Sequence, residues 1–207
     1  MTPGVEAMES RTDLEAISNE RLGQRLRELR TRSGKSLRAV ARELGISASA
    51  VSQIERGAMR PSVSRLIAYV SAIGAPLAAV FDPEEEQPHD DPAVPGFAIR
   101  RAWEVAPIEL SGGVTFRRLS PVPAPDVEFF ESTYPPNAIS TAHGQFLKHE
   151  GYEVGTVTQG ELTIEFESEV VALAKGDSIT FPCSRPHIIG NRSETETAVA
   201  TWLIVHR

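Results

Sequence analysis

Hydrophobic residues recur with a helical period in the first part of the chain. Leu22, Leu26 and Leu29 lie at i, i+4 and i+7, which places them on one face of a helix. Apolar residues continue at spacings of three and four as far as residue 81, interrupted by glycines and by helix-capping residues. The later helices are expected to begin at Ser36, Ser47, Ser62 and Pro76. This pattern predicts an all-α domain of five helices over residues 20–81.

After residue 97 the pattern changes to short apolar or alternating runs, separated by Gly, Pro, Asn and Ser. These runs cover residues 114–119, 127–134, 161–166, 170–174, 178–181 and 198–205. Short, closely spaced strands are typical of a β-sandwich or β-barrel. We therefore expect an α+β multidomain chain in which residues 97–207 form an all-β domain.

Two further segments show neither period. Residues 1–19 are polar and acidic, and they predict a flexible N-terminal arm. Residues 82–96 (DPEEEQPHDDPAVPG) are acidic and rich in proline. Because proline stiffens a chain and like charges repel, this segment predicts an extended linker between the two domains.

The charge of the chain is distributed unevenly. The net charge is −7, yet the segment from Arg21 to Arg65 holds 11 basic residues against three acidic ones, Glu28, Glu43 and Glu55. That segment therefore carries a net charge of +8 and the rest of the chain −15. Such asymmetry indicates one region made to meet a polyanion and another that is not.

Cysteine content and hydropathy bear on location. Cys183 is the single cysteine, so the chain has no internal disulfide, which fits a reducing compartment. No apolar run approaches the roughly 20 residues that cross a bilayer. The first residues also lack the basic head and apolar centre of a signal peptide. We therefore expect a cytoplasmic protein.

The second and third predicted helices are separated by Gly45, which permits a sharp turn through a positive φ. Two short helices joined in this way form a helix-turn-helix, whose second helix enters the DNA major groove. Its outward residues are small or polar, namely Ala48, Ser49, Ser52 and Gln53. The flanking arginines expected to meet phosphates are Arg38, Arg42, Arg56 and Arg60. A helical docking domain that binds a protein partner is the alternative.

A specific motif covers the same region. Gly45-Ile46-Ser47 is followed by Ile54-Glu55-Arg56-Gly57, in the stretch SLRAVARELGISASAVSQIERGAMRPSVSRL. The other residues that carry the motif are Ser36, Ala41, Val51, Pro61 and Leu66. Without a gap over residues 21–81, the sequence resembles the phage-repressor or XRE-type helix-turn-helix family.

The resemblance assigns roles to particular residues. It implies that the positions reading bases and phosphates include Ser47, Ala48, Ser49 and Gln53. It also implies a structural ion pair between Arg30 and Glu55. Leu37 departs from the family pattern, since many members have a phosphate-contacting Gln there, so one backbone contact is expected to be missing.

Two groups of chemistry-bearing residues occur in the β region. His149 is followed after three residues by Glu153 and after six more by Gly160. The second group consists of Gly176, Pro182, His187 and Asn191. These groups look like the two motifs of the cupin superfamily, with Ser184 where a glycine is usual. The resemblance covers residues 97–207 and implies a double-stranded β-helix, or jelly roll, with an apolar-walled cavity.

The cupin resemblance implies three metal ligands, His149, Glu153 and His187. Two histidines and a carboxylate can hold a divalent ion such as Zn, Mn, Fe or Ni with open positions. The fourth ligand position holds Leu147, which is expected to add an apolar wall and weaken the site; His143 could reach it through a loop. The alternative is a metal-free barrel that binds an organic ligand or has only a structural role. The polar candidates for lining the cavity are Arg117, Tyr134, Thr156 and Trp202.

These observations together predict a sequence-specific DNA-binding transcriptional regulator. A homodimer would place two reading helices on double-stranded operator DNA, and a small-molecule effector in the cupin domain would alter their spacing or order. The chain is not expected to be an enzyme, and no catalytic residue is assigned. The alternative function is a metal-dependent cupin oxygenase or isomerase with an accessory DNA-binding domain.

Overall fold

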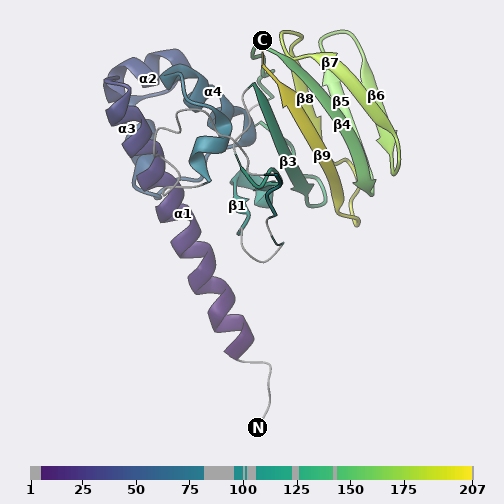
Figure 1. Ribbon diagram of the computed structural model, residues 1–207, viewed down its shortest axis with the longest axis horizontal. Helices are drawn as coiled ribbons and strands as arrows, with labels where there is room; N and C mark the ends of the chain where they lie inside the picture. Colours follow the sequence, from purple (N-terminus) through teal and green to yellow (C-terminus); the bar gives the residue numbers. More distant parts are fainter. Residues whose placement is uncertain are drawn as a thin grey trace.

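The protein has a helical part and a β part that lie side by side (Figure 1). The computed structural model describes residues 6–81, 96–99, 101, 106–122, 126–141 and 144–206. The helices are α1 (Glu6–Arg32), α2 (Leu37–Leu44), α3 (Ala48–Glu55) and α4 (Val63–Ile73), followed by the 3-10 turn η1 (Leu77–Val80). The predicted α+β organisation is confirmed. All of the predicted linker over residues 82–96 except Gly96 lies outside the described residues.

The first helix begins earlier than the sequence pattern predicted. Residues 6–19, expected to belong to a flexible arm, are the first half of α1, which projects away from the rest of the molecule (Figure 1). Pro3 and Gly4 are followed by no glycine or proline until Gly23. Since nothing in this stretch breaks a helix and Glu, Ala, Leu and Arg favour one, the helix continues to Glu6 without an apolar stripe.

The predicted fifth helix is wrong as an α-helix. Leu77–Val80 form a single 3-10 turn, in which the Ala79 N–H donates to the Pro76 carbonyl at 3.1 Å. Four residues are too few to close an α-helical ladder, so the segment closes with a bond between residues three apart. Leu77 and Val80 are nonetheless buried, so the turn packs as the fifth helix was expected to.

The helical domain is held by the apolar stripes of its helices. Leu22 and Leu26 of α1 are buried together with Val40 of α2 and Val51 of α3. α1 also approaches α3 closely at Gly23, where an added Cβ would lie 2.5 Å from the carbonyl oxygen of Ile54. This close approach fixes α3 against α1 through backbone contact.

The β part consists of two sheets. The strands are β1 (Ile108–Glu109), β2 (Thr115–Arg118), β3 (Val127–Tyr134), β4 (Tyr152–Gln159), β5 (Glu161–Phe166), β6 (Val170–Ala174), β7 (Ser178–Pro182), β8 (His187–Gly190) and β9 (Ala198–Val205), with the 3-10 turn η3 (Ser111–Gly113) after β1. One sheet has the strand order β1-β2-β3-β9-β4-β7 and the other β6-β5-β8. Phe166 of β5 and Phe181 of β7 meet edge to face, with ring centroids 5.4 Å apart, and so join the sheets. This two-sheet arrangement agrees with the predicted jelly roll.

Trp202 of β9 is the largest side chain between the sheets and determines what its neighbours can be. Its indole N–H donates to the Ser132 hydroxyl at 2.8 Å, which satisfies a buried donor. Its ring lies over Gly155 of β4, where a Cβ would be 2.2 Å from the ring carbon Cζ3. Only glycine fits at that position.

Candidate DNA-binding face and barrel cluster

The turn between α2 and α3 is built by backbone and capping hydrogen bonds. Gly45 adopts φ 65°, and the next N–H, that of Ile46, donates to the Ala41 carbonyl at 3.0 Å. The Ser47 hydroxyl then accepts from the Ala50 N–H at 3.1 Å and caps α3. A left-handed residue followed by an N-cap turns the chain within two residues, as the sequence predicted.

α3 presents a small, polar face to solvent. Val51 and Ile54 are 0% and 1% exposed and anchor the inner side of the helix. Ser49 on the opposite side is exposed, while Ser52 and Gln53 are half-buried. Of the other residues predicted to contact DNA, Ala48 is half-buried and the exposed ones are Arg38, Ser47 and Arg56. The structure therefore brings the predicted reading residues together on one accessible face.

The flanking arginines behave differently from one another. Arg38 and Arg42 are exposed on α2, and the Arg56 guanidinium donates to the Ser52 hydroxyl at 2.5 Å, which holds it beside the reading face. Arg60, in contrast, forms an ion pair with Glu109 of β1. The expectation that Arg60 meets phosphate is not supported, because the chain turns at Pro61 toward the β domain.

A buried ionic network fixes the end of α3. Arg30 of α1 donates through Nε and Nη2 to the Oε1 and Oε2 atoms of Glu55, at 2.5 and 2.9 Å. The ion pair expected between these two residues is therefore present. Tyr69 of α4 donates its hydroxyl hydrogen to Glu55 Oε1 at 2.6 Å, so three helices converge on one carboxylate. The sequence motif did not reveal Tyr69, which occupies an ordinary apolar position of α4.

Electrostatic interactions in this network keep Arg30 and Tyr69 in the protonation states that donate hydrogen bonds to Glu55. The hydrogen bond that Arg30 donates to Glu55 is the largest influence that raises the pKa of Arg30. Burial, followed by the hydrogen bond with Glu55, raises the pKa of Tyr69 well above its usual value. The guanidinium therefore stays charged and the phenol stays a donor, so that Glu55 keeps both partners.

The two cupin-like motifs converge inside the β domain. His149 lies just before β4, Glu153 on β4 and His187 at the start of β8. Glu153 Oε1 is 2.9 Å from His149 Nε2 and 3.8 Å from His187 Nε2. One ligand atom from each residue lies within 4.8 Å of the others, and Glu153 and His187 are buried. His143, the other candidate, lies outside the described residues.

Backbone contacts orient both imidazoles. Nδ1 of His149 is 3.1 Å from the Glu150 carbonyl and Nδ1 of His187 is 2.9 Å from the Arg185 carbonyl. A carbonyl partner favours the proton on Nδ1, which leaves Nε2 of each ring turned toward Glu153. Burial alone would lower the pKa of His149, but the hydrogen bond and charge of Glu153 outweigh it, so the pKa is raised.

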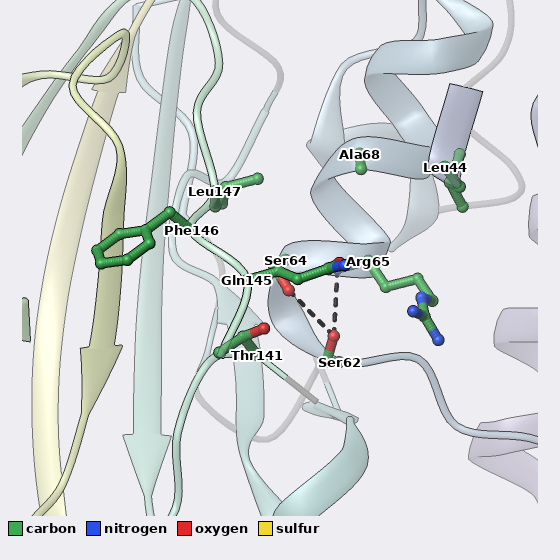
Figure 2. Close-up of a pocket in the computed structure, with 9 residues that line it drawn as sticks. All are labelled: Leu44, Ser62, Ser64, Arg65, Ala68, Thr141, Gln145, Phe146 and Leu147. Atoms are coloured by element: carbon green, nitrogen blue, oxygen red, sulfur yellow. Dashed lines mark hydrogen bonds between the residues drawn. The ribbon is translucent and has the colours of Figure 1, made fainter. Parts of the chain in front are cut away.

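Leu147, at the fourth ligand position of the cupin motif, lies next to this cluster. Its backbone N–H donates to the His187 carbonyl at 3.0 Å and its carbonyl accepts from the His187 N–H at 2.9 Å. Figure 2 shows the Leu147 side chain pointing toward the helical domain. Leu147 is also directly opposite His187 in this antiparallel bridge, so the expectation that it adds an apolar wall to the cluster stays a prediction.

The four polar candidates for lining the barrel divide into two groups. Arg117 pairs with Glu131, with 2.7 Å between Nη2 and Oε1, and lies on the outer side of the sheet with Thr156. Tyr134 and Trp202 point inward and are buried. The buried Tyr134 hydroxyl has no hydrogen-bond partner in the described part of the chain, and burial raises its pKa, with a further contribution from the charge of Glu153.

The two domains meet along a seam. The Ser64 N–H of α4 donates to the Ser140 carbonyl, and the Ser111 N–H donates to the Pro61 carbonyl, both at 2.9 Å. A buried carboxylate, Glu128 of β3, accepts from the Ala78 N–H at 2.6 Å. A cavity of about 90 Å³ lies in this seam between α4 and the segment before β4, and its lining includes Thr141 and Leu147 (Figure 2). We refer to these contacts and this cavity as the seam.

A helix-turn-helix joined to a two-sheet barrel defines the class of transcription regulators that carry a cupin domain. Two family models match the chain: one for a helix-turn-helix domain over residues 21–80 and one for a cupin domain over residues 130–204. The chain is 31% identical over 173 residues to the HTH-type transcriptional regulator PuuR of Escherichia coli, a match that spans 83% of the chain and 88% of the relative.

The chain belongs to the XRE family of helix-turn-helix transcriptional regulators, in the PuuR-like group with a C-terminal cupin domain. It also shares its fold with an HTH_3 family transcriptional regulator from Vibrio cholerae, at a TM-score of 0.65 and 22% identity, over 93% of this chain and 99% of that one. Hydroxypropylphosphonic acid epoxidase from S. wedmorenis matches with a TM-score of 0.43 and 17% identity, over 90% and 98% of the two chains.

These findings confirm the predicted family, fold class and function. The protein is a DNA-binding transcriptional regulator with a cupin domain. In the described part of the chain, no helix is both long and apolar enough to span a membrane.

Proposed function

We propose that this regulator reads its operator as a homodimer, with α3 of each copy in the major groove. Ser49 and Gln53 would contact base edges, with Ser47, Ala48 and Ser52 beside them. The observation that carries this proposal is the accessible polar face of α3, whose inner side is fixed by the Arg30–Glu55 pair. Because operator DNA is in the cytoplasm, we place the protein there.

Phosphate contacts in this proposal come from three arginines around α3. Arg38 and Arg42 are exposed on α2, and Arg56 is exposed after α3. Arginine donors on both sides of a reading helix set its register on the DNA backbone without reading sequence. Their contribution should therefore depend on salt, whereas that of Gln53 should depend on the base sequence.

Fluorescence anisotropy with labelled DNA from upstream of the protein's own gene tests this proposal. Gln53→Ala should raise the Kd for the operator by roughly 10-fold to 100-fold and reduce discrimination against unrelated DNA. Arg38→Ala should weaken binding to all sequences and lower the salt slope by about 1. The matched control is Gln159→Ala, the same substitution at an exposed position of β4.

The same binding measurements can contradict the proposal that α3 reads bases. If Gln53→Ala and Gln159→Ala bind operator with the same affinity as the unmodified protein, α3 does not read bases. Absence of salt-sensitive binding to the operator would exclude phosphate contacts, and the helical domain would then be a protein-docking module.

We also propose that His149, Glu153 and His187 form a binding centre for a divalent metal ion. The donor set fits such an ion, because two Nε2 atoms and one carboxylate oxygen face one another within 4.8 Å. Carbonyl partners on both Nδ1 atoms hold the rings in the tautomer that coordinates through Nε2. A bound Zn, Mn, Fe or Ni ion would supply a Lewis acid with open positions for an oxygen-bearing effector.

The effector itself is proposed to be a small polar molecule inside the cupin domain. The buried Tyr134 hydroxyl supports this, since a buried hydroxyl without a partner is costly and an entering polar group would satisfy it. We infer a sensing role and not a catalytic one, because the curated relative that is 31% identical over 83% of the chain is a transcriptional regulator.

A route from the barrel to α4 supports effector control of DNA binding. β8 carries His187, and two residues later the Ile189 N–H donates to the Ser140 hydroxyl at 3.0 Å. The Ser140 carbonyl accepts from the Ser64 N–H at the start of α4. A ligand that shifts β8 would therefore move Ser140, and with it the helical domain.

Metal content of the full chain tests the binding centre. After incubation with Zn²⁺, Mn²⁺, Fe²⁺ or Ni²⁺ and dialysis, elemental analysis should find about one ion per chain for the metal that fits, and a large loss in His187→Ala. The control is His206→Ala, since His206 contacts Glu128 outside the cluster. Less than about a tenth of an ion per chain with every metal would rule out a metal centre, and with it the metal-dependent oxygenase or isomerase alternative.

A further inference from the structure

The outer side of the six-stranded sheet carries two rows of apolar side chains. Inward residues alternate with outward ones along β3, β9 and β4, which lie side by side (Figure 1). The register aligns Phe129 of β3 with Leu203 of β9, and Leu203 with Val154 of β4. In the neighbouring row, Val127 is aligned with Val205, and the same row continues to Tyr152 and Pro182. We call these positions the apolar rows.

The apolar rows are unusual for a sheet surface. An antiparallel sheet with one face on a core normally turns polar residues to solvent on the other. Here Phe129 and Val154 are each 37% exposed, and no charged side chain occurs in either row. The next row across the strands is polar and consists of Glu131, Thr201, Thr156 and Ser178.

The helical domain does not cover these rows. Glu128 and Phe130, on the inward side of β3, contact the helical domain through Ala78 and Phe81. Phe129 lies between them on the same strand and therefore points the other way. A partner seated on the apolar rows would leave the reading face of α3 accessible.

We propose that the apolar rows are the centre of an interface with a second copy of this chain. Each chain carries a net charge of −7, so two copies repel, and an uncharged face is where they can meet. A sheet face of this kind can pack on itself about a two-fold axis as two stacked sheets. This inference rests on the proposed function, because a homodimer supplies the two reading helices that a two-part operator requires.

The size of the face is consistent with this occupant. The apolar rows span three neighbouring strands, and contiguous exposed apolar patches of this kind are often functional. A standard interface buries about 800 Å² on each partner, with an apolar centre and a polar rim. The apolar rows would supply the centre, and the polar row through Glu131 and Thr201 would supply part of the rim.

The mass of the full chain in solution without DNA tests the interface. Sedimentation velocity at micromolar concentration should give a species of twice the 22.5 kDa chain mass. Val154→Glu places like charges face to face and should raise the Kd of the dimer at least about 100-fold, giving a monomer. The matched control is Val170→Glu on β6 of the other sheet, where the native valine is 61% exposed, and this variant should remain dimeric.

In the sedimentation experiment, the interface would be overturned by a monomeric unmodified protein or by a Val154→Glu variant that dimerises as tightly as Val170→Glu. If circular dichroism shows that Val154→Glu is unfolded, Val154→Cys with a bifunctional maleimide replaces it, because the native Cys183 is fully buried. Cross-linked dimer at Val154→Cys and none at Val170→Cys supports the interface, and absence of cross-linking at Val154→Cys refutes it. These measurements omit DNA, so a dimer that fails to bind operator would refute the proposed operator reading and leave the interface standing.

Discussion

At the scale of single residues, the contact between α1 and α3 depends on a charge pair removed from water. The side chains of Arg30 and Glu55 are 13% and 4% exposed. Removing the cation leaves the buried Glu55 carboxylate with the Tyr69 hydroxyl but without the positive charge that paired with it. Since breaking a buried pair costs about 3–5 kcal/mol, Arg30→Met should lower the free energy of unfolding by that amount. Urea denaturation followed by circular dichroism measures the change.

Arg21→Met is the control for this variant, because Arg21 is exposed on the same helix. Its cost should stay within about 0.5 kcal/mol, as is usual for surface substitutions. Equal losses for the two variants would mean that the Arg30–Glu55 pair does not hold α3 in place. The DNA-reading face would then need a different support.

Cys183 offers a second test at this scale. Burial, followed by the charge of Glu153, raises the pKa of its thiol to about 12, so almost no thiolate exists at pH 8. A disulfide reagent such as DTNB should therefore leave the folded protein unmodified at pH 8 and react fully in urea. Because the pKa of the Cys183 thiol is higher in the folded protein than in the unfolded chain, its contribution to the free energy of unfolding is complete below the pKa of the unfolded thiol. This contribution is lost as the pH rises through the unfolded value toward 12. Rapid reaction of the native protein would show that the thiol is accessible.

At the scale of elements, much of the β domain was readable from the sequence. The bounds predicted for residues 127–134, 161–166, 170–174 and 198–205 agree with β3, β5, β6 and β9. These strands alternate or form apolar runs between turn residues, which is a local signal. β4 and β8 were not predicted as strands. β4 carries apolar side chains on both faces, and β8 is four residues long and wholly buried, so neither alternates in polarity.

The residues of the candidate sites also differ in whether a local sequence pattern predicts them. The reading residues of α3 and the cluster of His149, Glu153 and His187 follow from motifs with fixed local spacing. Tyr69 on Glu55, and Glu128 on the N–H of Ala78, depend on contacts between distant segments, which no local pattern encodes. These two contacts therefore could not be predicted from local sequence patterns, because tertiary packing brings their partners together.

Gly155 illustrates such a tertiary constraint and can be tested. Gly155→Ala would drive a methyl group into the Trp202 ring, which would have to move. Overpacking of this kind costs about 1–3 kcal/mol. Urea denaturation and tryptophan fluorescence should both report the change. Gly190→Ala is the control, since its Cβ would meet the exposed side chain of Ile139, which can move aside, and an equally large loss there would contradict the role given to Trp202.

At the scale of the whole molecule, the seam makes the two domains one mechanical unit. Phe81 of the helical domain packs against Phe130 of β3, with ring centroids 5.5 Å apart. The backbone bonds of Ser64 and Ser111 and the ion pair of Arg60 with Glu109 also join the two domains. Because apolar and polar contacts occur together, we expect the domains to unfold in a single transition.

The substitution Glu128→Ala tests whether the seam couples the unfolding of the two domains. Glu128→Ala leaves the Ala78 N–H without its partner, which costs about 1–3 kcal/mol where that donor stays buried. Calorimetry should then resolve two transitions, with the helical domain unfolding first. Glu131→Ala is the matched control, because Glu131 lies on the same strand but pairs with Arg117, both 27% exposed, on the side away from the helical domain. That variant should keep one transition and lose less than about 1 kcal/mol. A single, unshifted transition in Glu128→Ala would mean that the bond from Ala78 to Glu128 does not contribute to the coupling. Two transitions in the unmodified protein would mean that the seam does not transmit stability between the domains, and the route from β8 to α4 would lose its physical basis.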